Sequence, residues 1–171
     1  MIRIISGVFR GRKLKTPPGD KIRPTSDRVK ESLFNILQND LGGSRVLDLF
    51  AGTGSLGLEA LSRGASFAVF VDNDPTNGQL LHDNIDKLAG DRARIYIMDF
   101  ARAIEQMASR GVKFDIVFVD PPYLMNLYKK ALDLLFESRI LNASAIVVLE
   151  QPQNMTIQKT QNSEAYARRK Y

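Results

Sequence analysis

The chain has 171 residues, of which 44% are apolar and 25% charged, and its net charge is +5. These values are typical of a single soluble domain that is long enough to bury a core. The absence of cysteine excludes a disulfide framework and any cysteine-based metal site or nucleophile, and it fits a reducing compartment. No apolar run is long enough for a signal peptide or for the ~20 residues of a membrane span. We therefore expect a cytoplasmic enzyme or binding protein without a membrane partner.

Positive charge is concentrated at the amino-terminal end. Residues 1–30 carry nine bases against two acids, a net +7, which leaves −2 for the rest of the chain. A basic segment on a slightly acidic body favours a polyanionic partner such as nucleic acid. The alternative interpretation is a solvated face that keeps the protein soluble.

Residues 1–24 are predicted to form a basic β arm and a connector. The arm should contain two short strands, at residues 2–5 and 8–14, ahead of the Pro/Gly-rich connector TPPGDKIRPT (residues 16–25). We expect the arm to be an appendage, and residues 25–171 to form one compact unit.

The main unit is predicted to open with a helix and then to alternate strands with helices. Thr25 or Ser26 can cap the first helix, and apolar residues recur at helical spacing until Gly42 and Gly43 end it. The strands that follow are predicted at residues 45–50, 67–72, 94–99, 114–120 and 144–151, and the helices between them at residues 55–64, 75–90, 100–111 and 127–138. Short Val/Ile/Phe runs without alternation are typical of strands buried on both faces. The sequence therefore predicts a doubly wound, Rossmann-like α/β fold with a mostly parallel sheet, which binds ligands beyond the carboxyl ends of its strands.

A glycine motif follows the first of these strands. Gly52, Gly54 and Gly57 in DLFAGTGSLG have the G-x-G-x-x-G spacing, which permits a tight turn, approach of backbone amides to a ligand and close packing of the next helix. Asp72 lies twenty residues beyond Gly52, at the end of the second strand, where a carboxylate can accept from both ribose hydroxyls. Together these features indicate a cofactor of the adenosine type.

Two further acids favour S-adenosylmethionine (SAM) over a nicotinamide dinucleotide. Asp48 suits the ammonium of methionine, whereas a pyrophosphate would be repelled by a carboxylate beside its glycine loop. Asp99 can accept from the exocyclic amine of adenine while Phe100 covers the ring. Taken singly, Asp48 can equally be a solvated or helix-capping acid, and Asp99 the N-cap of the next helix.

The segment VFVDPPY (residues 117–123) must end the fourth strand, because two consecutive prolines cannot donate ladder hydrogen bonds. Asp120 and the carbonyl of Pro121 can accept the two N–H hydrogens of an exocyclic base amine, which aligns its nitrogen with a methyl donor and stabilises the developing positive charge. Pro121 and Pro122 fix the backbone, and Tyr123 offers a face on which a flipped base can stack. The alternative is a strand-ending turn with an exposed tyrosine.

These motifs resemble known enzymes. DLFAGTGSLGLEALSRGA followed by VDPPY is similar to the Rossmann-type, SAM-dependent methyltransferases that modify exocyclic amines of bases. RIISGVFRGRKL and RPTSDRVKESLFNIL, ahead of that core, resemble the bacterial 16S ribosomal RNA guanine-N2 methyltransferases of the RsmD type, from Arg3 to about Glu150. The resemblance implies methylation of the N2 amine of one guanine in the small-subunit RNA, on an assembled or partly assembled 30S particle.

The resemblance also implies roles for individual residues. The methionine part of SAM would be held by the glycine loop, the ribose and the adenine by side chains after the second and third strands, the target base by the VDPPY segment, and RNA phosphate by the arm. The residues for the methionine part are Asp48, Phe50, Ala51, Gly52, Thr53 and Gly54, those for the ribose are Asp72 and Asn73, and those for the adenine are Asp99 and Phe100. The residues for the target base are Asp120, Pro121, Pro122 and Tyr123, and those for RNA phosphate are Arg10, Arg12, Lys13 and Arg23.

Two features depart from the family pattern. The acid after the second strand is often Glu and here is Asp72, whose shorter side chain can still serve a ribose. The chain ends at AYARRKY, where relatives continue into a last strand, so either the terminus is truncated or that strand is short.

Other functions stay open at this point. An adenine-N6 DNA methyltransferase shares the DPPY chemistry but normally needs a large target-recognition domain. A nicotinamide-dependent oxidoreductase is favoured only by the glycine spacing, and a non-catalytic RNA-binding protein of ribosome assembly would have no use for an intact DPPY. No metal is predicted, because no His or carboxylate cluster has ligand spacing. His82 is interpreted as a surface residue and Met98 as a core residue, and we expect a monomer while a dimer stays open.

Overall fold

A five-stranded parallel sheet forms the centre of the protein. The computed structural model describes residues 2–17, 27–121 and 125–149. The strand order is β3-β2-β1-β4-β5, and every pairing is parallel. The strands are β1 (Arg45–Asp48), β2 (Phe67–Asp72), β3 (Ala93–Ile97), β4 (Phe114–Val119) and β5 (Leu141–Leu149). The predicted Rossmann-like α/β fold is confirmed.

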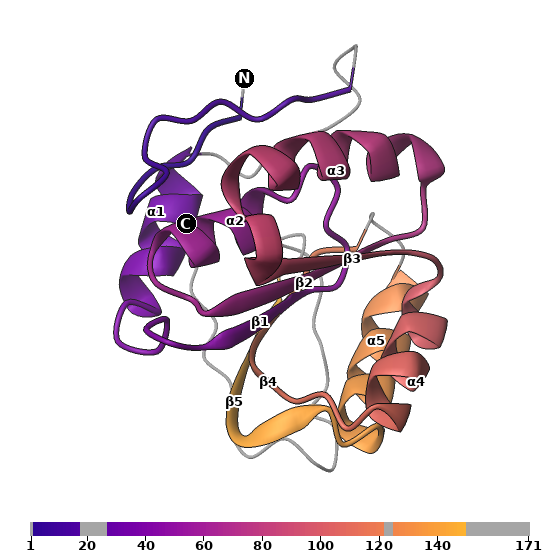
Figure 1. The fold of residues 1–171 in the computed structure, drawn as a ribbon. Coiled ribbons are helices and arrows are strands. Elements are labelled where there is room, and N and C mark those ends of the chain that lie inside the picture. The colour runs from indigo at the N-terminus through magenta and orange to yellow at the C-terminus, as the bar shows by residue number, and fades with distance from the viewer. Residues whose placement is uncertain (1, 18–26, 122–124, 150–171) are drawn as a thin grey trace.

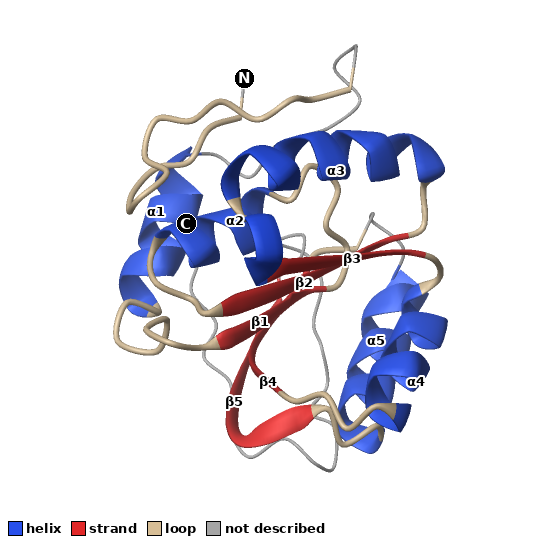
Figure 2. Ribbon diagram, in the orientation of Figure 1, coloured by secondary structure: helices blue, strands red, loops and turns tan. Residues whose placement is uncertain are grey.

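Helices cover both faces of this sheet (Figures 1 and 2). They are α1 (Asp27–Ile36), α2 (Ser55–Ser62), α3 (Pro75–Leu88), α4 (Phe100–Ser109) and α5 (Met125–Glu137), with a short 3-10 helix η1 (Gly90–Arg92) before β3. Helices α1, α2 and α3 lie on one face, and α4 and α5 lie on the other. The result is the three-layer arrangement that buries apolar strands on both sides.

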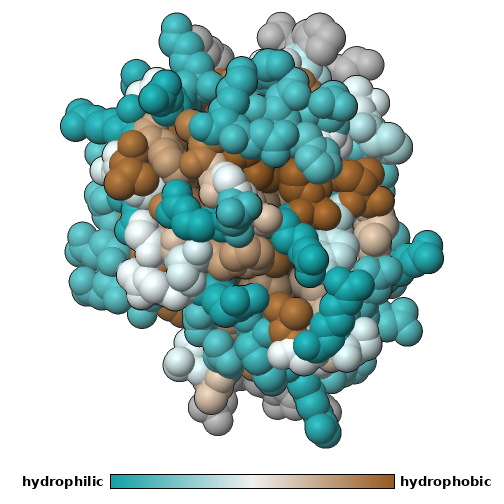
Figure 3. Space-filling view, viewed as in Figure 1, coloured by the Kyte–Doolittle hydropathy of each residue, from teal (hydrophilic) through white to brown (hydrophobic). Residues whose placement is uncertain are grey.

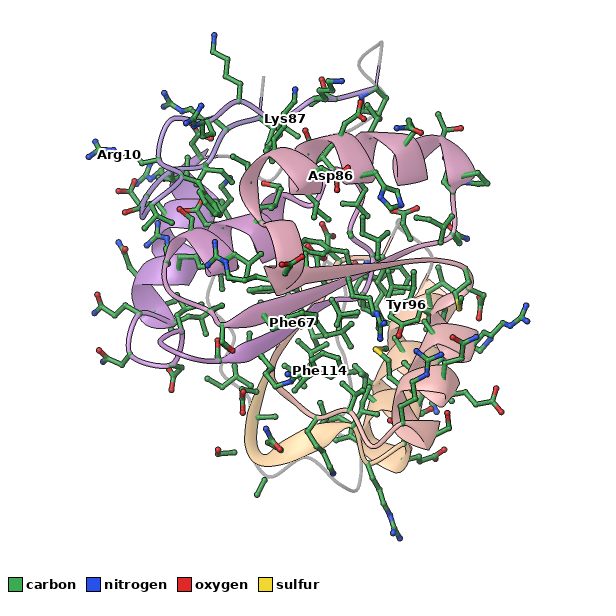
Figure 4. The ribbon with its side chains drawn as sticks, in the orientation of Figure 1. Arg10, Phe67, Asp86, Lys87, Tyr96 and Phe114 are labelled. Carbon is green, nitrogen blue, oxygen red and sulfur yellow. The ribbon has the colours of Figure 1, made fainter. Side chains whose placement is uncertain are left out.

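Successive strand residues point alternately into two hydrophobic cores. In β2, Phe70 packs into the core on the α1–α3 side, whereas Val69 and Val71 pack into the core on the α4–α5 side. Tyr96 and Phe114, labelled in Figure 4, belong to the second core. The continuous apolar runs of the sequence therefore arise because each strand supplies both cores.

The order of the strands places a switch point between β1 and β4. From β1 the chain continues outward through β2 to β3, and it then crosses to β4 and β5 on the other side of β1. The loops that follow β1 and β4 consequently leave the sheet on opposite sides of a shared crevice. Ligands of doubly wound folds bind in this crevice.

Two element boundaries differ from the prediction by three residues or more. Helix α1 ends at Ile36, six residues before Gly42, and turns bury Leu37 and Leu41 instead of a further helical turn. The spacing of the apolar residues correctly indicated that they are buried, but residues in turns can be buried as well as residues in a helix. Strand β5 begins at Leu141, three residues earlier than predicted, where it pairs with Phe114 of β4 beside a register irregularity.

The amino-terminal arm is packed into the core and is not an appendage. Instead of two predicted strands it forms an isolated antiparallel bridge between Arg3 and Lys13, with Gly7 and Gly11 at positive φ in the turn between them. Ile2, Ile4 and Leu14 are buried in the same core as α1, α2 and α3. Figure 1 shows the arm lying across α2 and α3, on the side of these helices away from the sheet.

Candidate active site

The glycine loop and Asp120 flank the switch point. The loop starts where β1 ends, and the Leu49 N–H donates to the carbonyl of Phe118 in β4 at 3.0 Å. Asp120 follows the end of β4, where its side chain is half-buried, and Pro121 is buried next to it. Pro122 and Tyr123, the other two residues of the predicted target-base segment, lie outside the described residues.

Two predicted acids hold the glycine loop through its backbone. Asp72, at the end of β2, accepts from the Gly52 N–H at 2.7 Å. Asp48, at the end of β1, accepts from the Gly57 N–H, in the first turn of α2, at 3.0 Å. Both carboxylates are thus used to shape the loop. For Asp48 this is the helix-capping interpretation that the sequence had left open.

Two glycines of the loop are required for different physical reasons. Gly52 has φ of +53°, a conformation that side-chain-bearing residues rarely adopt, and the space where its Cβ would point is open. At Gly57 a Cβ would come within 2.3 Å of the Phe70 ring, so this glycine permits α2 to pack closely on β2. The predicted uses of the glycines in a tight turn and in close helix packing are both observed.

Burial changes the acidity of Asp48. The side chain is only 2% exposed, and removal from water raises its pKa to about 7. The bond from Gly57 acts in the opposite direction, and the charge of Asp72 contributes to the rise. A cation placed beside Asp48 would favour its ionised form, so the group is suited to respond to a ligand ammonium.

A hollow of about 70 Å³ lies beyond the carboxyl ends of β1, β2 and β3. Four of its lining residues, Phe50, Asn73, Asp99 and Phe100, were predicted to contact the cofactor. The rings of Phe50 and Phe100 are in contact, with their centroids 5.2 Å apart. Asp99 caps α4 by accepting from the Ala101 N–H at 2.9 Å through Oδ1. Since a carboxylate accepts through two oxygens, capping leaves Asp99 able to receive a further donor.

The rest of the hollow was not predicted. Leu49, Val71, Met98 and Leu127 also line it. Met98, interpreted from sequence as a core residue, is half-buried and both packs against the second core and faces the hollow. Leu127 comes from α5, and nothing in its sequence context distinguishes it from a core leucine.

Asp72 also binds groups on its own side of the loop. Its Oδ1 accepts from the Asp74 N–H at 2.9 Å, and the Asn77 side-chain amide lies 3.3 and 3.4 Å from its two oxygens. The contacts with Asn77 are the longest of the set. They are therefore the contacts that a stronger donor, such as a hydroxyl, would replace at the least cost.

The predicted RNA-binding residues lie on the arm, away from the glycine loop. Arg10, Arg12 and Lys13 are exposed, and Arg23 lies outside the described residues. The Val8 N–H donates to the carbonyl of Ser62 at 2.8 Å, which fixes the tip of the arm at the carboxyl end of α2. Figure 4 shows Arg10 at the outer edge of the molecule, and Figure 3 shows hydrophilic surface over the arm and α3.

A buried charge cluster fixes the other side of the arm. Glu59 of α2 is 0% exposed and accepts from the backbone N–H groups of Ile5 and Ser6 at 2.8 and 3.0 Å. Its carboxylate also pairs with Arg63 at 2.8 Å and with the buried Lys30 of α1 at 3.4 Å. Neither Lys30 nor Glu59 was singled out from the sequence.

Within residues 2–17, 27–121 and 125–149, no three His, Cys, Asp or Glu side chains are grouped as a metal ion would require. In the same part of the chain, no helix combines the length and the apolar character needed to cross a membrane.

Comparison with known proteins places these features in a family. The family model described as "Conserved hypothetical protein 95" matches residues 2–171. The chain is 37% identical to "Ribosomal RNA small subunit methyltransferase D" of Haemophilus influenzae, over 99% of this chain and 93% of that protein. It is 41% identical to the protein of the same name from Escherichia coli K12, over 87% of this chain and 74% of that protein.

Solved structures agree with this relationship. The structure of yhhF from Escherichia coli superposes with a TM-score of 0.81 at 39% identity, covering 92% of this chain and 85% of that chain. A hypothetical protein from Thermus thermophilus gives a TM-score of 0.80 at 31% identity, covering 92% and 90%. The chain therefore belongs to the family of the ribosomal RNA small subunit methyltransferases D, the RsmD type that its sequence motifs resemble.

Proposed function

We propose that this protein transfers the methyl group of SAM to the exocyclic N2 amine of a guanine in 16S ribosomal RNA. Its family makes it a SAM-dependent methyltransferase of ribosomal RNA. The observation that supports transfer to an exocyclic amine is the position of Asp120, which follows β4 on the other side of the switch point from the glycine loop that follows β1. A donor held by the loop and an amine held by Asp120 would meet there.

The residues at the carboxyl ends of the strands fit SAM. The hollow has aromatic and apolar walls for adenine, and Asp99 at its rim can accept from the adenine amine. Asp72 and Asn73 would hold the ribose. The loop from Asp48 to Gly54 would hold the methionine part, with the Asp48 carboxylate as the partner of its ammonium. When bound, SAM supplies a methyl group on a positively charged sulfur, which is electrophilic.

The same residues do not suit a dinucleotide. A pyrophosphate binds at the amino end of a helix by accepting from free backbone N–H groups. Here the Gly57 N–H of α2 already donates to Asp48, and a second carboxylate, Asp72, occupies the Gly52 N–H. An anion at this place would meet two carboxylates and fewer donors, which argues against a nicotinamide-dependent oxidoreductase.

The acceptors after β4 provide for the target amine. The lone pair of an exocyclic guanine amine is delocalised into the base, so the nitrogen is a weak nucleophile. Asp120 and the carbonyl of Pro121 would accept its two N–H hydrogens, orient the nitrogen and stabilise the positive charge that develops on it. Tyr123 would stack on the flipped base.

The arm would contact RNA phosphate. Arg10, Arg12 and Lys13 are exposed on a segment whose backbone is tied to α2. Because the tip of the arm is tied to the carboxyl end of α2 and the glycine loop precedes the amino end of that helix, the arm would bind RNA that continues past the target base. Such an extended contact suits a structured 30S particle as the substrate.

The proposal is tested by transfer of labelled methyl groups. Small subunits from cells that lack this gene, wild-type subunits and duplex DNA are each incubated with the protein and labelled SAM. Label should enter only the subunits from the deletion strain, and mass analysis of the nucleosides should identify it as N2-methylguanosine. Label in DNA adenine would instead support the adenine-N6 alternative. Label in another ribosomal nucleoside would show that the target is not the N2 amine of guanine.

We predict that the affinity for S-adenosylhomocysteine (SAH), the product of SAM, rises with pH up to about 7 and then levels off. In the free protein, burial keeps Asp48 protonated below this pH, and pairing with the ligand ammonium requires loss of the proton. Below the pKa the affinity should therefore fall by up to about tenfold per pH unit. Calorimetry in buffers of different ionisation enthalpy should detect the released proton. An Asp48→Asn variant with the same pH profile would rule out this role.

Reversal of charge on the arm should weaken RNA binding and its dependence on salt. In Arg10→Glu with Arg12→Glu, the affinity for small subunits should fall, and the slope of log K against log salt should decrease by about one for each lost phosphate contact. The arm should stay folded, because Arg12 is tied by its backbone, to Ile4 and Phe9. Arg94→Glu with Arg102→Glu changes the net charge equally at exposed residues outside the arm, and its slope should stay as in the wild type. An unchanged slope in the arm variant would show that the arm does not contact RNA phosphate.

A further inference from the structure

Asn84 of α3 is a buried side chain that joins the arm to the glycine loop. This residue is 3% exposed. Its Oδ1 accepts from the Lys15 N–H at 2.8 Å, and its Nδ2 donates to the Lys15 carbonyl at 3.1 Å and to the Thr53 carbonyl at 3.0 Å. Lys15 lies at the end of the described arm, and Thr53 lies between Gly52 and Gly54 in the glycine loop.

This arrangement uses every polar hydrogen of the side chain. A primary amide has two donors and one acceptor group, and here both donors and the acceptor are paired. Rotation of the amide would break all three bonds in a buried site, which costs several times the energy of one exposed bond. Asn84 therefore has one favourable orientation, and that orientation fixes the arm and the loop relative to each other.

The link is selective for the backbone of the arm. The side chain of Lys15 pairs separately with Asp83, at 2.5 Å, in an exposed ion pair. Exposed ion pairs contribute little to stability and are screened by salt. The two neighbouring residues of α3 thus hold the same arm residue in different ways: Asn84 by buried backbone bonds that reach the glycine loop, and Asp83 by an exposed bond that does not.

We propose that Asn84 is a positioning residue that couples cofactor binding to RNA binding; this inference rests on the function proposed above. A cofactor that orders the glycine loop also fixes the Thr53 carbonyl, and through Asn84 it fixes the end of the arm. RNA then binds an arm that is already ordered, so binding costs less conformational entropy. By linkage, bound RNA raises the affinity for the cofactor by the same factor.

The test measures this coupling factor directly. The affinity for small subunits from the deletion strain is measured by co-sedimentation, without SAH and with saturating SAH. In the wild type, SAH should tighten binding by about fivefold or more. In Asn84→Ala the factor should fall towards one, whereas in Asp83→Ala it should stay as in the wild type. Partial unfolding of a variant would raise the apparent factor, because SAH binds the folded protein and stabilises it, so a factor that falls towards one is not explained by lost stability.

A second pair of variants covers the case in which Asn84→Ala does not fold. Lys15→Pro and Lys15→Ala both remove the ammonium group, but only the proline removes the N–H that donates to Asn84. The factor should fall in the proline variant alone. A wild-type factor of one, or an undiminished factor in folded Asn84→Ala or Lys15→Pro, overturns the coupling. A wild type that modifies no subunit at all overturns the proposed function itself, which the transfer assay reports independently.

Discussion

Replacement of Asp120 by alanine is expected to lower the rate of methyl transfer by about 100-fold or more, because preorganised groups that stabilise developing charge contribute on this scale. The affinity for SAH should stay within about twofold of the wild type. The reason is the position of Asp120 on the far side of the switch point, after β4, whereas the hollow and the glycine loop follow β1, β2 and β3. Single-turnover transfer to subunits and calorimetry with SAH measure the two effects separately.

A matched variant at the other end of β4 controls for the loss of charge. Asp115 accepts from the Arg45 N–H and from the Asn142 side chain at the amino end of the strand. Asp115→Asn removes one carboxylate from the same strand and keeps an acceptor oxygen, so methyl transfer should remain close to that of the wild type. Transfer by Asp120→Ala at a similar rate would exclude the proposed role of Asp120. A large loss of SAH affinity in Asp120→Ala would instead show that Asp120 binds the cofactor.

The fold could be predicted because a parallel sheet leaves a simple pattern in the sequence. The run FAVFVD was predicted as a strand and forms β2, Phe67–Asp72, with the same bounds, since its residues supply both hydrophobic cores. The end of β4 was equally clear, because Pro121 cannot continue the ladder. The start of β5 was missed, because residues 141–143 show no strand pattern in the sequence, and Leu141 is placed by its pairing with Phe114 of β4 beside a register irregularity.

The candidate site could be predicted in outline only. Chain order places Asp48, Asp72, Asp99 and Asp120 at or just beyond the carboxyl ends of successive strands, and parallel strands bring such positions to one edge of the sheet. Which groups these acids contact is a matter of three-dimensional distance. The sequence could not decide between a ligand-binding and a capping role for Asp99, and in the structure its position serves helix α4 and the rim of the hollow together.

The residues that tie the arm to the body were missed for a related reason. Glu59 stands in SLGLEALSRG, where an acid would be interpreted as the solvent-exposed side of a helix, yet it is fully buried. Its partners Ile5 and Ser6 lie more than fifty residues earlier in the chain and are bound through their backbone, which carries no residue-specific signal. A buried acid of this kind becomes recognisable only once the arm is placed on α2.

Glu59→Gln is expected to have the largest effect on stability, a loss of about 3–5 kcal/mol in the free energy of unfolding, because removal of one partner leaves a buried charge uncompensated. The carboxylate balances Lys30, which is 1% exposed, and it receives four donors. Burial lowers the pKa of Lys30 and the charge of Glu59 acts against that change, so the lysine depends on this acid to remain charged. Urea denaturation followed by circular dichroism gives the loss.

A double-mutant cycle distinguishes this pairing from a general loss of packing. Lys30→Met removes the cation and retains much of the buried volume, and the combined variant Lys30→Met with Glu59→Gln should be more stable than the sum of the two single losses predicts. Lys129→Met, which removes an exposed ion pair with Asp133, should leave the unfolding midpoint almost unchanged. Additive losses in the cycle would show that Lys30 and Glu59 act independently. In that case Glu59 would hold the arm through the N–H groups of Ile5 and Ser6, and Lys30 separately through its bond to the Arg3 carbonyl at 2.6 Å, so each single variant should make the arm more sensitive to protease.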